Sequence, residues 1–360
     1  MRKLVYKVLL GVNILLASAL LLSYLAVHVS PGRFALPALF GLAYPYLLLM
    51  NIMLAMTWAV LLRPEALISV AVIIAGANHL SNFIRIDNHD KSTEGAFKVM
   101  SYNVRLFNVY ESQSSGSERM IIAFLKEAQP DIICLQEFYI KGDPKEKDRR
   151  LRSALGGEFE SHMKMTAMRS NSYYGNVTYS RFPIVNRGQV IHPNSSGLTI
   201  FTDVLIENDT FRIFNNHLQS FRLRSMERSF VEEMAGSSDN EALETMKSLS
   251  VSLRRAFIRR AGQADVVKSQ IDRSPYPVII AGDFNDTPVS YTYRRMRGDF
   301  MDAFVSTGYG AGFTYRGYYP ANRIDYILYD DKTLESRNFE IIKVKYSDHY
   351  PVSGWFSKRN

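Results

Sequence analysis

The sequence has a single cysteine, Cys134, among its 360 residues. One cysteine can form neither an intramolecular disulfide nor a thiolate metal site. Cys134 lies in the apolar run DIICLQEF (131–138), so we expect a buried thiol without a catalytic role. The sequence also has no internal repeat and no low-complexity tract, so the fold has to be predicted from its motifs and hydrophobic patterns.

Charge is absent from three runs near the N-terminus, residues 8–32, 34–62 and 66–84. Roughly 20 apolar residues suffice to cross a bilayer as a helix. A signal peptide is the alternative for the first run, but signal peptides usually have a shorter apolar region and two more runs follow. We expect three transmembrane helices, at about 8–29, 36–62 and 66–84, with Pro37 and Pro45 at the entry and at a kink of the second.

The basic residues beside these runs give a weak orientation signal. Arg2, Lys3 and Lys7 favour a cytoplasmic N-terminus, and Arg63 favours the same side for the second loop. The basic residues after the third run argue the other way: Arg85, Lys91 and Lys98. We expect an integral protein of a plasma or inner membrane, with the large domain on the extracytoplasmic side.

The remaining chain is expected to form one catalytic domain over 97–360, after a membrane domain over 1–86 and a polar linker over 87–96. Strand patterns occur at 97–107, 131–138, 173–185, 198–220 (a hairpin turning at 207–209), 278–281, 323–330 and 346–356, and helix patterns at 117–129 and from 221 to about 271. This order predicts α/β or α+β layers, with two sheets and helices outside them.

Polar side chains stand at the ends of six of these predicted strands. In PVIIAGDFNDTP (277–288), for example, a buried strand ends at Asp283 and Asn285, which a plain turn could also explain. An unpartnered carboxylate after Ile132–Leu135 would cost several kcal/mol, so Glu137 needs a ligand or a hydrogen-bond network. We expect one site built from all six ends: Asn103; Gln136 and Glu137; Asn215 and His217; Asp283 and Asn285; Asp325; Asp348 and His349.

The order SYNV, LQE, NNHL, GDFN, RIDYI, SDHYPV resembles the endonuclease/exonuclease/phosphatase family, which has the fold of pancreatic deoxyribonuclease and the apurinic-site endonucleases. The resemblance covers residues 97 to about 356. It implies a four-layered α/β sandwich of two mixed β-sheets flanked by helices. It also implies a magnesium-dependent hydrolase of phosphate esters, with Mn²⁺ as the alternative ion.

The resemblance and the chemistry of phosphodiester hydrolysis imply roles for these residues. Glu137 would hold the metal, with Asn103 and Asp348 as further ligands. Asp283 would activate the attacking water and Asn285 would hold it. The remaining roles are as follows: His349 would donate to the phosphate, Asp325 would orient His349, His217 would stabilise the transition state or assist the leaving group, and Asn215 and Arg105 would contact substrate.

Simpler explanations remain open for some of these residues. Asn103 could be a turn residue, Asp348 could cap a turn, and His217 could only pack. Arg105 is a departure from the family, because several of its nucleases carry an acid there. The neighbouring tyrosines are expected in the core: Tyr102, Tyr326 and Tyr350.

The sequence therefore predicts a membrane-anchored, metal-dependent phosphodiesterase of the nuclease type. The first alternative is a phospholipid or sphingolipid headgroup hydrolase. The second is an inactive membrane-tethered binding module, which the intact constellation disfavours. A basic segment between 221 and 260 is expected to be either a solvated helix pair or a rim that contacts phosphate or lipid headgroups: Arg222, Arg224, Arg228, Arg254, Arg255, Arg259 and Arg260.

Overall fold

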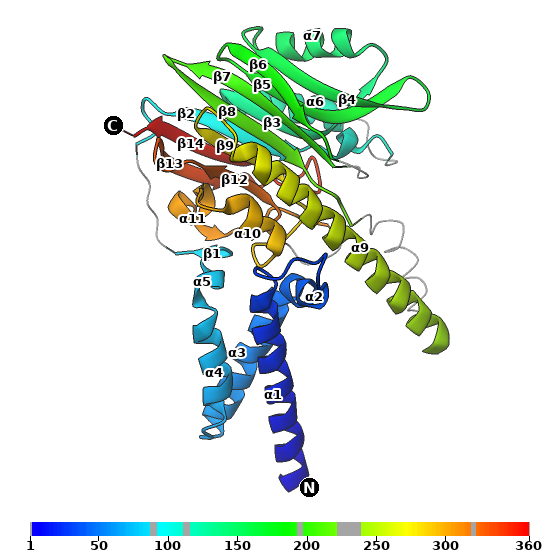
Figure 1. Ribbon diagram of the computed structural model, residues 1–360, viewed down its shortest axis with the longest axis vertical. Helices are drawn as coiled ribbons and strands as arrows, with labels where there is room; N and C mark the ends of the chain where they lie inside the picture. Colours follow the sequence, from blue (N-terminus) through cyan, green and yellow to red (C-terminus); the bar gives the residue numbers. More distant parts are fainter. Residues whose placement is uncertain are drawn as a thin grey trace. The chain divides into compact units, whose positions relative to one another are not determined.

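The computed structural model describes residues 2–86, 92–110, 116–192, 197–221, 239–317 and 322–359 (Figure 1). The chain forms two compact units. The first, which we call the helical unit, comprises Met1–Leu80, Gln219–Ala264 and Asp286–Arg295, and the second, the sheet unit, comprises Ser81–Leu218, Asp265–Asn285 and Met296–Asn360. Two segments from within residues 97–360 thus group with the N-terminal helices, which differs from the expected division at the linker. The arginines at 222, 224 and 228 lie outside the described residues.

The N-terminal helices contradict the expectation of three membrane spans. Their bounds are α1 Arg2–Leu25, α2 Leu36–Leu42, α3 Tyr44–Val60, α4 Ala66–Ala75 and α5 Ala77–Leu80. Among the described residues, one helix, Lys3–Leu25, is long and apolar enough to cross a membrane. The pair α2 and α3 is bent by 68° and would count as one more only if it formed a single broken span, and α4 has 10 residues.

Two local features explain these breaks. Pro45 is the second residue of α3, a position where its missing N–H costs no hydrogen bond, so a new helix begins there rather than continuing through a kink. Gly76 follows the end of α4, and a Cβ at Gly76 would lie 2.2 Å from the ring of Tyr24. The close approach of Tyr24 thus falls at the point where the third apolar run stops being one helix. Composition alone did not reveal either break.

The helical unit has polar groups inside and apolar groups outside. Asn13, Asn51 and Ser69 are each 0% exposed. The Ser69 hydroxyl donates to Asn13 Oδ1 at 2.6 Å, and Asn51 Nδ2 donates to the carbonyls of Leu16 and Leu47. Most of the exposed large apolar side chains among the described residues belong to the first 80 positions.

The sheet unit contains two six-stranded mixed sheets, in the orders β13-β14-β2-β3-β5-β4 and β10-β12-β9-β8-β7-β6. A two-stranded sheet pairs β1 with β11. The strand bounds are β1 Ile84–Arg85, β2 Phe97–Asn103, β3 Ile132–Lys141, β4 Glu160–Met168, β5 Ser172–Ser180, β6 Ile184–Val190, β7 Leu198–Ile206, β8 Asp209–His217, β9 Val278–Asp283, β10 Met301–Asp302, β11 Gly310–Ala311, β12 Asp325–Tyr329, β13 Leu334–Ile341 and β14 Val352–Lys358. The helices in this part of the chain are η1 Arg105–Asn108, α6 Ser117–Ala128, α7 Pro144–Ala154, α9 Asp239–Ile271, α10 Tyr291–Arg297 and α11 Ala303–Thr307. Figure 1 labels these helices except η1, and the strands except β10 and β11.

Alternation of side chains along the strands builds two apolar layers. Val99 and Ile132 face the core between the two sheets, while their neighbours Met100 and Ile133 face α6 and α7. A strand residue points to the face opposite that of its neighbour, so the mostly buried strands β2 and β3 carry apolar side chains on both faces. The expected arrangement of two mixed sheets flanked by helices is confirmed.

Several predicted elements are present, and others, such as β13, α10 and α11, were not expected. The helix expected at 117–129 is α6, and the hairpin expected at 198–220 is β7 and β8, which turn at Glu207 with φ +55°. The helix α7 and the edge strand β4 were not predicted. Side chains of β4 are mostly half-buried or exposed, so the strand lacks the apolar pattern of the central ones.

Candidate active site

The strand register brings the predicted site residues to one edge of the two sheets. The parallel pair β2 and β3 places Asn103 opposite Gln136, and the parallel pair β8 and β9 places His217 opposite Asp283. The antiparallel strand β12 begins with Asp325 opposite Asp283. The carboxyl ends of neighbouring parallel strands meet at the same edge of a sheet, and the bond from Asn103 to Asp283 joins the edges of the two sheets.

Asp283 is the centre of this cluster and is 1% exposed. Its Oδ2 accepts from Asn103 Nδ2 at 2.9 Å and from Asn285 Nδ2 at 3.1 Å. Its Oδ1 accepts from the backbone N–H of Asn285 at 2.7 Å. Burial raises the pKa of Asp283 against the opposing effect of His349, so its carboxylate is a stronger base than an exposed aspartate.

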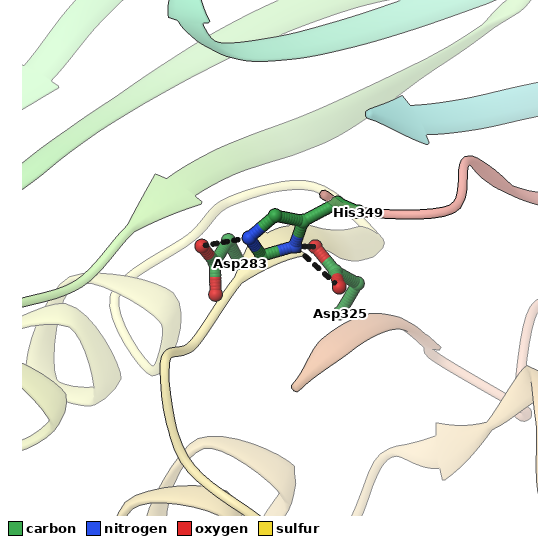
Figure 2. A group of neighbouring side chains, drawn as sticks. All are labelled: Asp283, Asp325 and His349. Carbon is green, nitrogen blue, oxygen red and sulfur yellow. Dashed lines mark hydrogen bonds and ion pairs between the residues drawn. The ribbon is translucent and has the colours of Figure 1, made fainter. Parts of the chain in front are cut away.

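His349 lies between Asp283 and Asp325 (Figure 2). Its Nδ1 donates to Asp325 Oδ2 at 2.9 Å, and its Nε2 lies 3.8 Å from Asp283 Oδ2. Burial alone would lower the pKa of His349, but the carboxylates of Asp325 and Asp283 together outweigh it and raise that pKa to about 9. At neutral pH the ring is therefore protonated, and a separation of 3.8 Å is too long for a hydrogen bond, so the Nε2–H can donate to another acceptor.

His217 lies beside both Glu137 and Asp283. Glu137 lies in a bulge of β3, where the register with β5 shifts between Leu135 and Phe138, and its φ is +49°. His217 Nε2 lies 3.5 Å from Glu137 Oε1 and 4.0 Å from Asp283 Oδ2. This Nε2 is buried and has no hydrogen-bond partner within the described residues. An unpartnered buried nitrogen between two carboxylates is positioned to bind something that the protein itself does not supply.

Backbone strain is concentrated at the same edge. Glu137, Asn285 and Arg105 have φ values of +49°, +54° and +50°, a region that costs a residue with a side chain roughly 1–2 kcal/mol. Gly282, just before Asp283, has φ +136°, and a Cβ there would lie 2.1 Å from the carbonyl oxygen of Asn216. A glycine is therefore required where β9 delivers Asp283, and residues in such conformations cluster at functional sites.

Arg105 and Asp348 form a pair at the rim of the cluster. Arg105 Nε lies 3.6 Å from Asp348 Oδ2, and the backbone N–H of Arg105 donates to Asn103 Oδ1 at 3.0 Å. The Arg105 side chain is 23% exposed. Arg105, which replaces an acid found in several nucleases of the family, thus places a cation beside the predicted metal ligand Asp348. The side-chain oxygen of Asn103 already accepts a hydrogen bond from the backbone of Arg105.

Asn215 does not meet the expectation of a substrate contact. Its side chain is 0% exposed and donates to the carbonyls of Leu135 and Val177. Its Oδ1 accepts from Gln136 Nε2 at 2.9 Å, and Gln136 Nε2 also bonds to Ser101. The bond between Gln136 on β3 and Asn215 on β8 therefore joins the two sheets in the interior, where both buried amides find their hydrogen-bond partners.

Three residues that shape the site were not predicted. Thr314 Oγ1 accepts from the backbone N–H groups of Ile324 and Asp325, and Ser347 Oγ donates to the carbonyl of Asn103 at 2.8 Å. The ring of Tyr315 lies 5.1 Å from the His349 ring in an edge-on arrangement. Ser347 belongs to the SDH motif and could have been noticed, whereas no local pattern distinguishes Thr314 or Tyr315.

The donors at this edge suit a metal ion. Single ligand atoms of Asp283, Asp325 and His349 all lie within 4.8 Å of one another, but a protonated His349 offers no lone pair, which leaves the carboxylates as donors. The carboxylate of Glu137 is the most accessible of the acidic groups, at 28% exposed. Carboxylate-rich oxygen donors are the ligands that hard divalent cations prefer. The single cysteine is excluded, since Cys134 is fully buried and burial raises the pKa of its thiol to about 12.

Comparisons with known proteins agree with this geometry. Residues 100–349 match the endonuclease/exonuclease/phosphatase family, and residues 6–83 match a domain of unknown function. A comparison with curated protein sequences found no match.

Solved structures share the fold at low identity. The human Nocturnin catalytic domain with bound sulfate anion is 17% identical, with a TM-score of 0.54, and the match covers 75% of this chain and 96% of that one. D. rerio TDP2 complexed with single strand DNA product is 16% identical, with a TM-score of 0.52, over 73% of this chain and 99% of that one. An endonuclease/exonuclease/phosphatase from Bacteroides vulgatus is 16% identical, with a TM-score of 0.53, over 73% and 99%. With a family match over residues 100–349, the chain belongs to the endonuclease/exonuclease/phosphatase family.

Proposed function

We propose that the protein is a membrane-anchored, divalent-cation-dependent phosphodiesterase of the nuclease type. One observation carries this proposal: a buried carboxylate, Asp283, faces both the protonated His349–Asp325 pair and the unpartnered Nε2 of His217. A base, a cation and a second imidazole directed at one point are the groups that attack of water on a phosphodiester needs.

Each residue then has a step in the reaction. Asp283 removes a proton from the attacking water as the water oxygen bonds to phosphorus, and Asn285 holds that water beside Asp283. The Nε2–H of His349 donates to a non-bridging phosphoryl oxygen, and Asp325 keeps the ring oriented and charged. The bond from phosphorus to the leaving oxygen breaks, and His217 in its protonated form donates the proton that this oxygen takes.

Glu137 is the residue that we expect to hold the cation, because its carboxylate is accessible and lies 3.5 Å from the unpartnered nitrogen of His217. Asn103 and Asp348 are weaker candidates, because Asn103 Oδ1 accepts from Arg105 N and Asp348 lies 3.6 Å from the Arg105 guanidinium. The bound cation, Mg²⁺ or Mn²⁺, would neutralise charge on the phosphoryl oxygens. Arg105 would add a phosphate contact at the rim.

Membrane attachment rests on α1. Its exposed side chains are mainly apolar, among them Leu4, Val8 and Leu15, whereas Asn13 on the same helix is buried. A surface of this kind is stable in lipid and unfavourable in water. We propose that α1 anchors the protein in the plasma or inner membrane, with the catalytic residues on the extracytoplasmic side.

The test is a parallel assay of the full chain in lipid nanodiscs against single-stranded DNA, RNA and phospholipid vesicles, each with Mg²⁺, with Mn²⁺ and with EDTA. Glu137→Gln is the matched variant for metal binding. Cleavage of DNA or RNA that EDTA and Glu137→Gln abolish is the expected result, as the DNA product bound to the TDP2 structure suggests for the fold. Absence of hydrolysis with every substrate and ion would overturn the proposal.

A phospholipid headgroup is the second candidate substrate. The exposed apolar side chains of the helical unit favour it, because a tethered site meets headgroups at high local concentration. Headgroup release without nucleic-acid cleavage in the same assay would select this alternative.

A further inference from the structure

One arginine of the basic segment is not at the surface. Arg254, Arg255 and Arg259 on α9 are exposed, but Arg260 is 0% exposed. Its Nε lies 3.1 Å from Asp286 Oδ2, and its Nη1 donates to the backbone carbonyl of Gln219 at 2.9 Å. A fully buried guanidinium is retained only with partners that compensate its lost hydration, so its contacts define its role.

The two partners of Arg260 lie two and three residues after the ends of β8 and β9, the strands that carry His217 and Asp283. Gln219 is two residues after His217, and Asp286 is the residue after Asn285. Gln263, one turn beyond Arg260 on α9, accepts from the backbone N–H of Gln219 at 2.8 Å. Arg260 therefore holds together the two chain segments that leave β8 and β9.

The residues just before these partners are also joined. Asn285 Nδ2 donates to the carbonyl of Leu218 at 3.0 Å, and the N–H of Leu218 donates to the carbonyl of Asp283 at 3.0 Å. The chain after β8 thus bonds directly to the end of β9 and to Asn285 through Leu218. At the next residue of each chain, Gln219 and Asp286 are joined through the side chain of Arg260 on α9.

The segment after Asp286 is held by an N-terminal helix. Thr287 Oγ1 donates to the carbonyl of Gly41 in α2 at 3.4 Å, and Val289 is 0% exposed. A Cβ at Gly41 would lie 2.3 Å from the carbonyl oxygen of Val289 and 2.6 Å from the Cβ of Ala26. Only glycine allows the backbones to come this close.

We propose that Arg260 is a positioning residue for the candidate site, which fixes His217 and Asn285 by tying Gln219 to Asp286. Within the helical unit, α2 contacts the segment that follows Asp286. The catalytic part of this inference rests on the proposed function. Displacement of a catalytic group by about 1 Å can lower the rate about 100-fold.

The experiment uses the full chain in nanodiscs, with bis(4-nitrophenyl) phosphate as the diester and Mg²⁺ as the ion. We expect Arg260→Met to lower kcat about 100-fold with little change in KM. Arg260→Lys should recover part of the lost kcat, since lysine keeps the positive charge but lacks the planar set of donors of the guanidinium. The matched control is Arg259→Met, one residue away and exposed. Displacement of His217 or Asn285 should change the shape of the pH–rate profile, whereas partial unfolding of the variant should lower only the amplitude of that profile.

Hydrogen exchange measured by mass spectrometry gives a readout that needs no turnover. In Arg260→Met we expect faster exchange in the peptides around Leu218 and Asn285 and unchanged exchange in β2, at 97–103. The variant Gly41→Ala should accelerate exchange in 286–290, whereas Gly11→Ala, whose Cβ meets nothing within 4 Å, should not.

The outcomes separate the inference from the proposed function. Local acceleration with a loss of kcat supports both. Local acceleration in a protein whose wild type hydrolyses no diester supports the positioning role and overturns the proposed function. Exchange at Leu218 and Asn285 that equals wild type, or kcat within twofold of wild type, overturns the inference.

Discussion

The two units of the protein differ in the side chains that they expose. In the sheet unit, Val99, Ile132 and Ile279 are buried and apolar, as expected for a domain that folds in water. In the helical unit, Asn13 and Asn51 are buried while Leu15 and Met56 are 68% and 64% exposed. The proposed membrane anchor accounts for the second arrangement, because apolar surface costs nothing in lipid and polar groups there have to find partners inside the protein.

Three buried polar groups of the sheet unit form its candidate site. Asp283 is the last residue of β9, Asp325 is the first of β12 and His349 lies before β14, and a buried charge in such a place is costly without partners. In the helical unit the buried polar groups bond mainly to backbone and hydroxyls, which fixes helix packing. The same burial thus prepares a reactive cluster in one unit and a structural contact in the other.

The largest expected effect is loss of the imidazole's orientation in the sheet unit. Asp325→Asn should lower kcat roughly 10³–10⁴-fold, because an amide neither stabilises a charged ring nor fixes its tautomer. Initial rates on the substrate identified by the parallel assay measure this. Asp272→Asn, at an exposed aspartate that bonds only to Lys268 among the contacts described, should behave as wild type. Equal rates in the two variants would remove His349 from the chemistry.

The charge of His349 should make the stability of the sheet unit depend on pH. The pKa of His349 is about 9 in the folded protein and about 6.5 when unfolded. A raised folded pKa gives stability that is complete below about pH 6.5 and is lost as the pH rises through 9. At about 1.4 kcal/mol per pKa unit, the loss is about 3 kcal/mol.

Chemical denaturation of the full chain in detergent with EDTA, from pH 6 to 10, measures this loss. His349→Gln has no ionisable ring, so its free energy of unfolding should fall by correspondingly less over the same range. Parallel curves for the two proteins would contradict a raised pKa at His349.

In the helical unit, a charge on the outer face of α1 should disturb membrane insertion. Leu15→Arg exchanges an exposed apolar side chain for a cation, at a cost of about 3 kcal/mol at the centre of a span. The fraction that stays in the membrane after carbonate extraction should fall clearly below that of the control Leu15→Met. Retention of both variants to the same extent would show that this face does not meet lipid.

The smallest expected effect is inside the same helix. Asn13→Ala removes the acceptor of the Ser69 hydroxyl and the donor to the Glu65 carbonyl, which should destabilise the helical unit by about 1 kcal/mol. Unfolding in mixed micelles of increasing SDS fraction measures it. Val12→Ala, at the exposed neighbouring position, should lower the stability less. A larger loss for Val12→Ala than for Asn13→Ala would contradict a stabilising role for the buried Asn13.

Sequence alone predicted the sheet unit better than the helical unit. Asn103, Glu137, His217 and Asp283 could be found because each stands where an apolar run stops, and this pattern recurs along the chain. Parallel pairing brings β2 beside β3 and β8 beside β9, but the strand patterns do not show how the two sheets meet. The interior position of Asn215 could not be predicted, because an amide at a strand end has the same local pattern whether it faces substrate or the opposite sheet.

The other misses have a shared physical cause, which is that they depend on contacts distant in sequence. Arg260 looks like its neighbours Arg255 and Arg259 until Asp286 and Gln219 are in place around it. The third apolar run has the length of a membrane span, but its helix α4 ends before Gly76, where the ring of Tyr24 approaches closely. Composition indicates how apolar a segment is, and only the packing shows where its helix stops.

The central claim is that Asp283 activates water for a metal-dependent attack on a phosphodiester. The most direct measurement compares wild type and Asp283→Asn as full chains in nanodiscs, with Mg²⁺ and with EDTA, in water enriched in ¹⁸O. The account predicts ¹⁸O in the phosphoryl product of the wild type with Mg²⁺, and at least about a 10³-fold lower rate for the variant and for the chelated enzyme. Hydrolysis by Asp283→Asn at the wild-type rate, or ¹⁸O only in the leaving alcohol, would contradict it.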